Sequence, residues 1–367
     1  MRFVRPLSSH FAALLLIAVP PVAGAGAGAG IDTARALAHA APDATLREEL
    51  LHDVAAFLAR RGDSAGARSA AAQLPPGRQA MVLLELAAHL PDLRSNEAEQ
   101  LALDAQTAKA LTTDWRKARV AHLLAVAYAR RGKFDAAIAL AHTVPDPEEK
   151  ASALQAVVAH LNRAGEVAKA RELAATIEEN RRYGTYRQKA AALADTAQTV
   201  HARGNPDDAA TLLAQAELLL PKKPGWSDGG AYRDVAVAAY RCGQKEKAFE
   251  LLTRAEALAQ QIAGPWKVTE LTRIAAAWRD CADVARAAAR LTEAAVFLKT
   301  LQPLERAEEA LALAQGWALA GESLDGKAQA RALVTAVLAE ADREGNPETW
   351  RKPRVRALLA LAELGGK

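Results

Sequence analysis

A short phrase that recurs five times limits the fold of this chain more than any other feature. In each copy a glycine follows a basic stretch, and an alanine comes five residues later. The glycines are Gly62, Gly132, Gly165, Gly204 and Gly243, and the alanines are Ala67, Ala137, Ala170, Ala209 and Ala248. Glycine suits the left-handed turn after a helix, and alanine lets the next helix cross closely. The phrase therefore predicts a series of helical hairpins.

The spacing of this phrase sets the length of the repeating unit. Successive glycines are 70, 33, 39 and 39 residues apart, and the first interval corresponds to two units. Trp115 and Trp226 each precede a turn glycine by 17 residues. By the same spacing, Trp266 predicts a further unit with its turn near Asp283 and its alanine at Ala288. From about residue 33 to 364, amphipathic helical segments alternate with Pro/Gly breaks, which predicts an all-α chain.

The unit around Gly204 carries the small and turn residues of a known repeat family. These residues are Ala197, Gly204, Ala209, Ala216 and Pro221, and Tyr128 stands at a tyrosine position of the unit before Gly132. With them, segment 32–300 resembles the tetratricopeptide repeat (TPR) family, although alanine replaces the family's first glycine. The resemblance implies a right-handed α-solenoid of about seven to nine antiparallel hairpins. Residues 301–367 are expected to add one or two hairpins and a terminal cap.

The first 25 residues have the order of a secretory signal peptide. Arg2 and Arg5 are followed by an apolar run, residues 11–19, and by small residues up to Ala25. The run is about half the roughly 20 residues of a membrane-spanning helix, which favours cleavage after Ala25. Residues 26–31 are expected to form a flexible Gly/Ala linker. Because no cysteine near the cut could carry a lipid, we expect a periplasmic protein, with secretion to the outside as the alternative.

Charge and composition argue against several classes of function. The chain has 47 Lys and Arg against 43 Asp and Glu, and this near balance does not suggest nucleic-acid binding. No later segment is apolar enough to insert into a membrane. The eight histidines form no H-E-x-x-H motif, and two cysteines cannot complete a zinc site alone. We therefore expect no metal and no other cofactor.

One catalytic pattern occurs, the G-x-S-x-G motif at residues 225–229. In hydrolases this motif needs a strand before the serine and a helix after it. A helix and a proline-rich loop precede it here, so Ser227 or Asp228 is expected to cap the next helix instead. The sequence thus predicts no catalytic residue, and we expect that the protein is not an enzyme.

The repeat register places polar side chains on one face of the expected solenoid. In the TPR family, certain positions of each first helix face a concave groove. Ten residues before the turns stand His52, His122, Gln155, Ala194, Arg233 and Arg273, and two residues before them stand Arg60, Arg130, Arg163, Ala202, Arg241 and Cys281. The resemblance implies that the polar members bind a protein or peptide, and arginines suit one with acidic groups. Alternatively, the arginines near the turns only complement the helix dipole.

Two further residue types recur with the repeat. Cys242 and Cys281 are 39 residues apart, one local repeat, so a disulfide between neighbouring units could form in an oxidising compartment. The alternative is two buried small apolar side chains. The recurrent tryptophans are expected to pack on the preceding hairpins rather than to bind carbohydrate. They are Trp115, Trp226, Trp266 and Trp350.

These features favour an exported scaffold or protein-binding module of the cell envelope. The rival class is an α/α-toroid enzyme, a glycosidase or lyase that acts on an envelope polysaccharide and also consists of a dozen or so helices. Such an enzyme needs paired carboxylates in a cleft lined with aromatic side chains. An open superhelix would favour the scaffold, and a closed ring with inward acidic residues would favour the enzyme.

Overall fold

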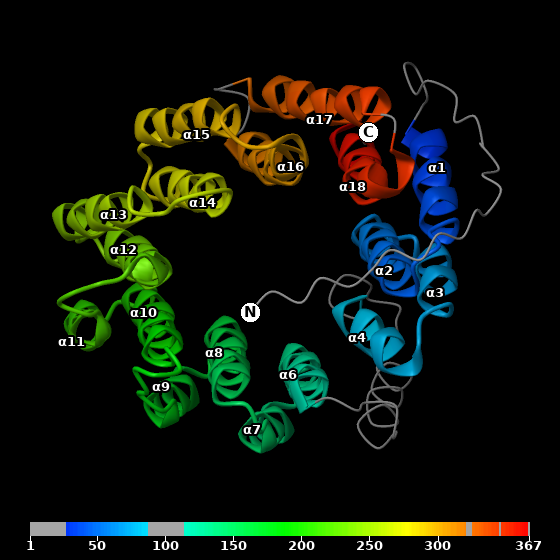
Figure 1. Ribbon diagram of the computed structural model, residues 1–367. Coiled ribbons are helices and arrows are strands. Elements are labelled where there is room, and N and C mark those ends of the chain that lie inside the picture. Colours follow the sequence, from blue (N-terminus) through cyan, green and yellow to red (C-terminus); the bar gives the residue numbers. More distant parts are fainter. Residues whose placement is uncertain (1–26, 87–113, 321–324, 345, 366–367) are drawn as a thin grey trace, which may run out of the picture.

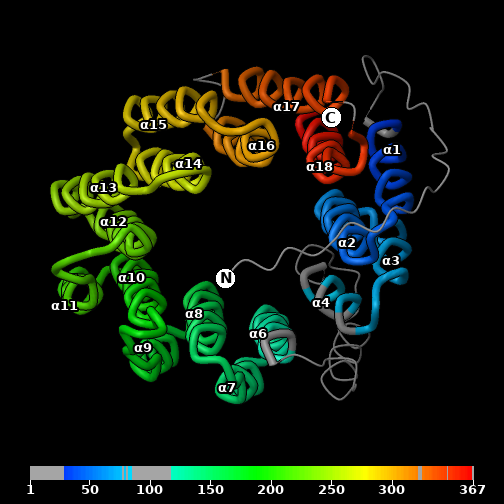
Figure 2. The backbone as a smooth tube through the Cα atoms, in the orientation of Figure 1, coloured from blue at the N-terminus to red at the C-terminus, as the bar shows by residue number. Residues whose placement is uncertain are grey.

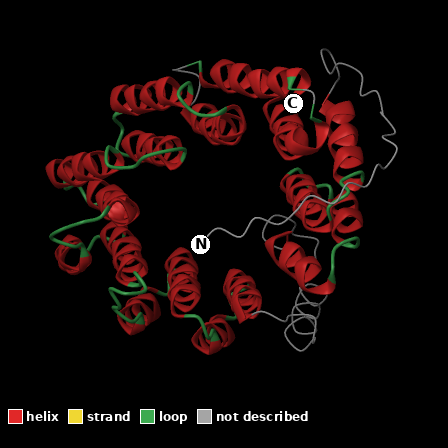
Figure 3. Ribbon diagram, viewed as in Figure 1, coloured by secondary structure: helices red, strands yellow, loops and turns green. Residues whose placement is uncertain are grey.

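The structure, a computed structural model, describes residues 27–86, 114–320, 325–344 and 346–365. Every regular element within these ranges is a helix (Figure 3), which confirms the all-α fold class. None of the described helices combines the length and the apolar character needed to cross a membrane. The predicted signal peptide, residues 1–25, lies outside the described residues.

Most helices form antiparallel hairpins in which a first helix, a tight turn and a second helix follow in order. The pairs are α2 (Ala44–Arg60) with α3 (Ser64–Ala71), α6 (Asp114–Arg130) with α7 (Phe134–Thr143), α8 (Pro147–Ala164) with α9 (Val167–Thr176), α10 (Tyr186–Ala202) with α11 (Pro206–Leu219), α12 (Gly229–Arg241) with α13 (Lys245–Ala259), α14 (Trp266–Asp280) with α15 (Val284–Leu298), and α16 (Pro303–Ala320) with α17 (Gly326–Arg343). The other described elements are α1 (Ala27–His39), α4 (Pro76–Leu86), α18 (Pro347–Gly365) and the 3₁₀ turn η1 (Trp226–Asp228). The chain is therefore an α-solenoid of TPR-like hairpins.

The hairpins form a closed ring (Figures 1 and 2). First helices, including α8, α10, α12 and α14, line the inside, and second helices lie outside. From α2 through α4 and α6 to α18, each inner helix contacts the next one around the ring, and α18 contacts α2. The last hairpin combines the two ends of the chain. In it α18 takes the place of the first helix, and α1 packs on it in the place of the second helix. With it, the described residues contain eight hairpins, within the expected seven to nine.

An apolar cluster joins the two ends of the chain. Val355, Leu358 and Leu359 of α18 are buried together with side chains of α1 and α2, among them Ala34 and Leu50. In an open solenoid the last helix would need a polar outer face, because it would have no neighbour there. The cap expected within residues 301–367 is therefore wrong: α18 completes a hairpin with α1.

The first helix begins earlier than the composition suggests. A flexible linker was expected over residues 26–31, but α1 starts at Ala27. Gly30 is buried, and a Cβ added to it would lie 3.9 Å from the carbonyl oxygen of Leu358. The linker expectation is wrong because these small residues let α1 approach α18 closely.

The turns follow the predicted register with one shift. The five turn glycines have φ between +72° and +84°, and the alanine five residues after each is fully buried. In the degenerate unit Ala282, not Asp283, takes the left-handed turn position with φ +58°, and the buried alanine is Ala287, not Ala288. A left-handed alanine costs about 1 to 2 kcal/mol, because its Cβ crowds a carbonyl oxygen.

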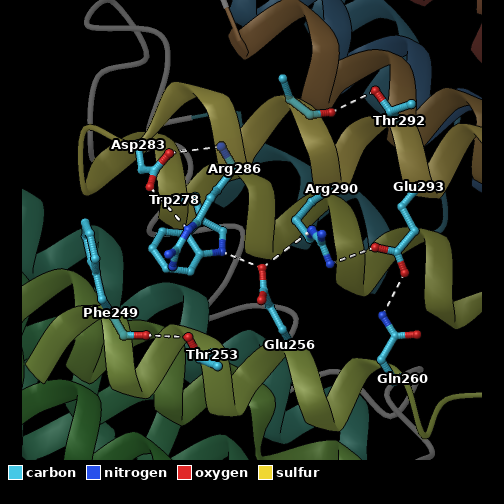
Figure 4. A network of polar contacts seen from close by, with 11 residues as sticks. Phe249, Thr253, Glu256, Gln260, Trp278, Asp283, Arg286, Arg290, Thr292 and Glu293 are labelled. Atoms are coloured by element: carbon cyan, nitrogen blue, oxygen red, sulfur yellow. Dashed lines mark hydrogen bonds and ion pairs between the residues drawn. The ribbon is translucent and has the colours of Figure 1, made fainter. Parts of the chain in front are cut away.

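A polar network around Trp278 holds this degenerate hairpin in place (Figure 4). The Trp278 indole is fully buried, and its Nε1 donates to Glu256 Oε1 at 2.7 Å. The Arg286 guanidinium lies 4.4 Å from the centroid of the indole ring. Arg290 Nε lies 3.5 Å from the same Glu256 oxygen. These contacts join α13, α14 and α15, so the hairpin keeps its packing although its turn lacks glycine.

Candidate binding cleft on the inner face of the ring

A cleft of about 460 Å³ opens on the inner face of the ring between α8, α10, α12 and α14. Its polar lining residues are Gln155, Asp195, Gln198, Arg233, Asp234, Arg241, Arg273 and Asp280, and the rest of the lining is alanine and Val237. This volume lies within the usual range of ligand sites. The small apolar residues leave room between the polar groups for a bound segment.

Four of the nine residues predicted for a concave face meet in this cleft. They are Gln155, Arg233, Arg241 and Arg273, and they come together because neighbouring first helices repeat the same position side by side. The other five do not line it: His52, His122, Arg60, Arg130 and Arg163. The expectation of one continuous strip therefore holds only from α8 to α14.

Arg233 is held in a buried ion pair. Its Nη1 contacts Glu270 Oε1 on the next first helix, and the two side chains are only 13% and 12% exposed. Burial lowers the pKa of Arg233 to about 10. Removing either partner would leave a charge buried without its counterpart. Arg233 therefore joins α12 to α14 instead of presenting its charge to a ligand.

Arg273 and Arg241 do present their charges to the cleft. The Arg273 side chain is 60% exposed, and its Nη1 lies 3.9 Å from Glu270 Oε2. The Arg241 side chain is 53% exposed, with Nη2 3.9 Å from Asp280 Oδ2 and Nη1 donating to Gln198 Oε1 at 2.9 Å. Exposed pairs at such distances contribute little to stability. Both guanidinium groups can thus bind a carboxylate without cost to the fold.

Three aspartates of the cleft were missed by the sequence analysis. Asp195 Oδ2 accepts a hydrogen bond from Asn162 Nδ2 at 2.7 Å, and Asp280 Oδ1 accepts one from Arg279 Nη2 at 2.8 Å. Asp234 makes no hydrogen bond or ion pair to any other described residue. Its side chain is accessible from the cleft, but the concave wall removes much of its hydration and raises its pKa. Asp234 thus makes no short ion pair, although the charge of the adjacent Arg233 favours its carboxylate form.

The sequence did contain a signal for two of these aspartates. Asp195 and Asp234 stand nine residues before their turn glycines, one position after the column that was counted. With the last turn at Ala282, Arg273 also stands nine residues before its turn. Adjacent helical positions differ by about 100° around the axis, and both of these positions face the cleft. The cleft is therefore lined by residues both nine and ten positions before the turns, not by the tenth position alone.

The two predicted histidines lie on other first helices of the ring. His52 belongs to α2 and His122 to α6. His122 Nδ1 lies 2.6 Å from Glu149 Oε2 of α8, and the imidazole is 11% exposed. This contact joins two neighbouring first helices, so His122 has a structural partner.

The remaining predicted arginines have partners within the ring. Arg60 Nε lies 3.9 Å from Glu363 Oε1 of α18, across the closure. Arg130 Nε donates to His160 Nε2 at 3.4 Å, and Arg163 Nη1 lies 3.4 Å from His160 Nδ1. Arg60, Arg130 and Arg163 all stand in the last turn of their helices, where they also complement the helix dipole.

The G-x-S-x-G motif forms a structural turn. Ser227 lies in η1, and Asp228 does not cap α12 with its side chain, contrary to expectation. Asp228 is 6% exposed and accepts hydrogen bonds from the backbone nitrogen of Gly225, at 2.8 Å, and from the hydroxyl of Tyr186. Burial and this hydrogen bond raise the pKa of Tyr186 to about 12. The motif thus fixes the entry to α12 against α10.

Cys242 and Cys281 are both free and buried, so the structure contains no disulfide between the neighbouring units. They follow the last residues of α12 and α14, as the repeat predicts. Burial raises the pKa of both thiols, that of Cys281 to about 11. The two thiols pack as small apolar groups. In the described ranges, no three His, Cys, Asp or Glu side chains gather in a way that could hold a metal ion.

The tryptophans divide into buried and exposed members. Trp350 is 4% exposed and packs in the core as expected. Trp226 and Trp266 are 57% and 65% exposed, so the expectation of packing is wrong for both. The Trp115 side chain lies outside the described part of the structure.

No family model and no curated protein matches this sequence. Solved structures of helical repeat proteins do resemble it. TPR-like repeats of a kinesin light chain-like protein from Podosopora anserina are 22% identical, with 62% of this chain and 97% of that chain covered and a TM-score of 0.33. A Rap protein complexed with competence and sporulation factor is 14% identical over 92% of this chain and 98% of that one, with a TM-score of 0.33. Ton1535 from Thermococcus onnurineus is 16% identical over 86% and 99%, with a TM-score of 0.30.

These identities and TM-scores are low. The class of this protein follows instead from its own geometry, in which TPR-like hairpins form a closed α-solenoid with a mixed-charge cleft on its inner face.

Proposed function

We propose that the ring is a scaffold that binds an extended segment of a partner protein in its inner cleft. One observation carries the proposal: Arg241, Arg273 and Asp234 face the same cleft, and none of them is needed by a buried ion pair. Carboxylates of a bound segment would meet the two guanidinium groups, which form strong charge-assisted hydrogen bonds. An ammonium or guanidinium group of the segment would meet Asp234.

This chemistry refines the partner expected from the sequence. A purely acidic segment suits the arginines, but three aspartates share the same cleft. Such a segment would bring its carboxylates close to Asp234, where like charges repel. A segment that carries both acidic and basic side chains fits the cleft better.

The test uses Arg273, because its loss leaves no buried charge behind. Envelope extract is passed over the immobilised protein, the retained partner is identified, and its affinity is measured by calorimetry. Arg273→Ala should weaken binding by roughly 1.5 to 3 kcal/mol, the usual contribution of a hydrogen bond to a charged group. Arg343→Ala, on the outer helix α17, is the matched control, since Arg343 is also exposed. Equal affinity of both variants would reject the cleft as the binding site.

Arg233→Ala is unsuitable for this test. It would leave Glu270 buried without its partner, which costs about 3 to 5 kcal/mol in comparable cases. A loss of binding in that variant would report unfolding of the cleft. Arg233, which the repeat register predicted as a binding residue of the groove, thus stabilises the fold instead.

We also propose that the protein acts in the cell envelope, after cleavage following Ala25. The support is the order of charged, apolar and small residues at the N-terminus. Protein recovered from the periplasm, or from the medium if it is secreted, should begin near Gly26. A cytoplasmic product that still begins at Met1 would contradict this.

A second candidate function is that of a helical-ring enzyme acting on an envelope polysaccharide. The closed ring and the aspartates on its inner face favour it, because these are the two features expected of such an enzyme. Against it, no aromatic side chain lines the described cleft, and Asp195 and Asp280 are held by Asn162 and Arg279. Asp234→Asn distinguishes the two functions. An enzyme that uses this carboxyl would lose cleavage of envelope polysaccharide, whereas a binding module would show no cleavage in either form.

A further inference from the structure

The exposed apolar side chains of the ring gather on one of its two edges. In antiparallel hairpins, each second helix ends at the edge where the next first helix begins. Three such connections follow one another, at residues 218–229, 260–267 and 296–302, and we call them the tryptophan edge. They carry Leu218, Trp226, Trp266 and Val296, which are 82%, 57%, 65% and 62% exposed. The opposite edge of the same hairpins exposes only Val284 and Leu319 among the large apolar side chains of the described residues.

Contacts between the connections show that they lie side by side. The Lys267 ammonium lies 5.2 Å from the centroid of the Phe297 ring, which joins the second connection to the third. The first connection contains η1, which packs against α13, the helix that leads into the second connection. The three connections thus lie on neighbouring hairpins at the same edge of the ring.

The exposed charges within these three segments are all positive, and the carboxylates of Glu217 and Glu305 flank them. Within the three segments the charged residues are Lys222, Lys223, Lys267, Lys299 and Asp228. Asp228 is buried and hydrogen-bonded. Lys222, Lys223 and Lys299 are exposed and make no hydrogen bond or ion pair to another described residue. Two exposed tryptophans, Trp226 and Trp266, are therefore presented to solvent together with these lysines.

We propose that the tryptophan edge docks the ring on an anionic phospholipid surface. Tryptophan is enriched at membrane interfaces because its ring is apolar and its N–H is polar. Lysines near such a surface are attracted by the anionic headgroups. A second copy of the chain suits this edge less well, because two tryptophan edges face to face would bring together Lys222, Lys223 and Lys299 of both copies, an excess of positive charge over the flanking carboxylates of Glu217 and Glu305. The proposal is independent of the cleft, which belongs to the inner face.

Sedimentation with vesicles tests the proposal. The protein is mixed with vesicles of phosphatidylcholine alone or of phosphatidylcholine with phosphatidylglycerol. We expect binding to the anionic vesicles, weakened by salt. Lys222→Ala, Lys223→Ala and Lys299→Ala together should reduce it roughly 100-fold, since each lysine contributes about five-fold. Trp226→Ala with Trp266→Ala should also reduce it clearly.

Val284→Ala with Leu319→Ala, on the opposite edge, is the matched control and should bind as the unaltered protein does. All variants keep the same N-terminus, so the predicted signal segment contributes equally to each. Binding that neither set of edge substitutions weakens would overturn the proposal, because the N-terminal segment would then account for it. A dimer that the tryptophan substitutions dissociate, without vesicle binding, would also overturn it in favour of a second copy. Arg273→Ala should leave vesicle binding unchanged, which separates this test from that of the cleft.

Discussion

Nη1 of Arg351 in α18 donates to the backbone carbonyl oxygen of Leu37 in α1 at 3.0 Å, across 314 residues of sequence. A second bond of this kind runs from Arg61 Nη1 to the carbonyl oxygen of Ala362 at 2.8 Å. These bonds accompany the apolar cluster between the chain ends. An open solenoid has two end units with one neighbour each, whereas every unit of a closed ring has two.

Ring closure predicts that α1 and α18 lose their structure together. Leu358 is 1% exposed in the closure cluster, so Leu358→Ala should destabilise the protein by about 2 to 5 kcal/mol. Hydrogen exchange should accelerate in both terminal helices before it does in α10. Leu319→Ala, at a side chain 62% exposed, should change little. Protection lost from α18 alone, with α1 unaffected, would contradict the closure.

The left-handed alanine predicts two substitutions of opposite sign. Ala282→Gly should stabilise the protein by about 1 kcal/mol, because glycine adopts φ +58° without strain. Gly243→Ala should destabilise it by a similar amount. No atom lies within 4 Å of a Cβ added at Gly243, so only its φ of +80° opposes the change. Denaturant midpoints measure both, and a loss of stability in Ala282→Gly would contradict the strain.

The contact between Glu149 and His122 predicts a pH-dependent loss of stability. The hydrogen bond from His122 lowers the pKa of Glu149 below its ordinary value of 4.5. A carboxyl with a lowered folded-state pKa stabilises the protein above its unfolded pKa, and the effect is lost as the pH falls through the folded-state value. Glu149→Gln should therefore cost about 1 kcal/mol near neutral pH and progressively less in acid. An equal cost at every pH would show that packing, not charge, is responsible.

His160 should remain neutral far below the usual range of histidine. Burial lowers its pKa to about 4, and Arg163 and Arg130 act in the same direction. Because the folded-state pKa lies below 6.5, this group makes stability decline as the pH falls from 6.5 toward 4. An NMR titration of the imidazole should show the low pKa, and Arg163→Gln should raise it. A pKa unchanged by that substitution would assign the whole shift to burial.

The sequence by itself determined the hairpins and their register. A left-handed turn needs glycine, and a close helix crossing needs a small residue five positions later, so both signals lie within one short segment. Ala67, Ala137, Ala170, Ala209 and Ala248 are all fully buried for this reason. The same register brought Gln155, Arg233, Arg241 and Arg273 into one cleft. It could not distinguish Arg233, which Glu270 holds, from Arg273, which is exposed, because their surroundings come from the neighbouring helices.

Only the tertiary structure decided that the array closes. Closure depends on the sum of small rotations between many neighbouring hairpins, and no short segment encodes that sum. For the same reason the sequence did not reveal the roles of the two ends. Gly30 lies in a segment with the composition of a linker, but it packs against Leu358. The position of α18 at the end of the chain suggests a cap, but α1 packs on it. Local pattern thus determined each unit, whereas contacts between residues about 300 positions apart determined the ring.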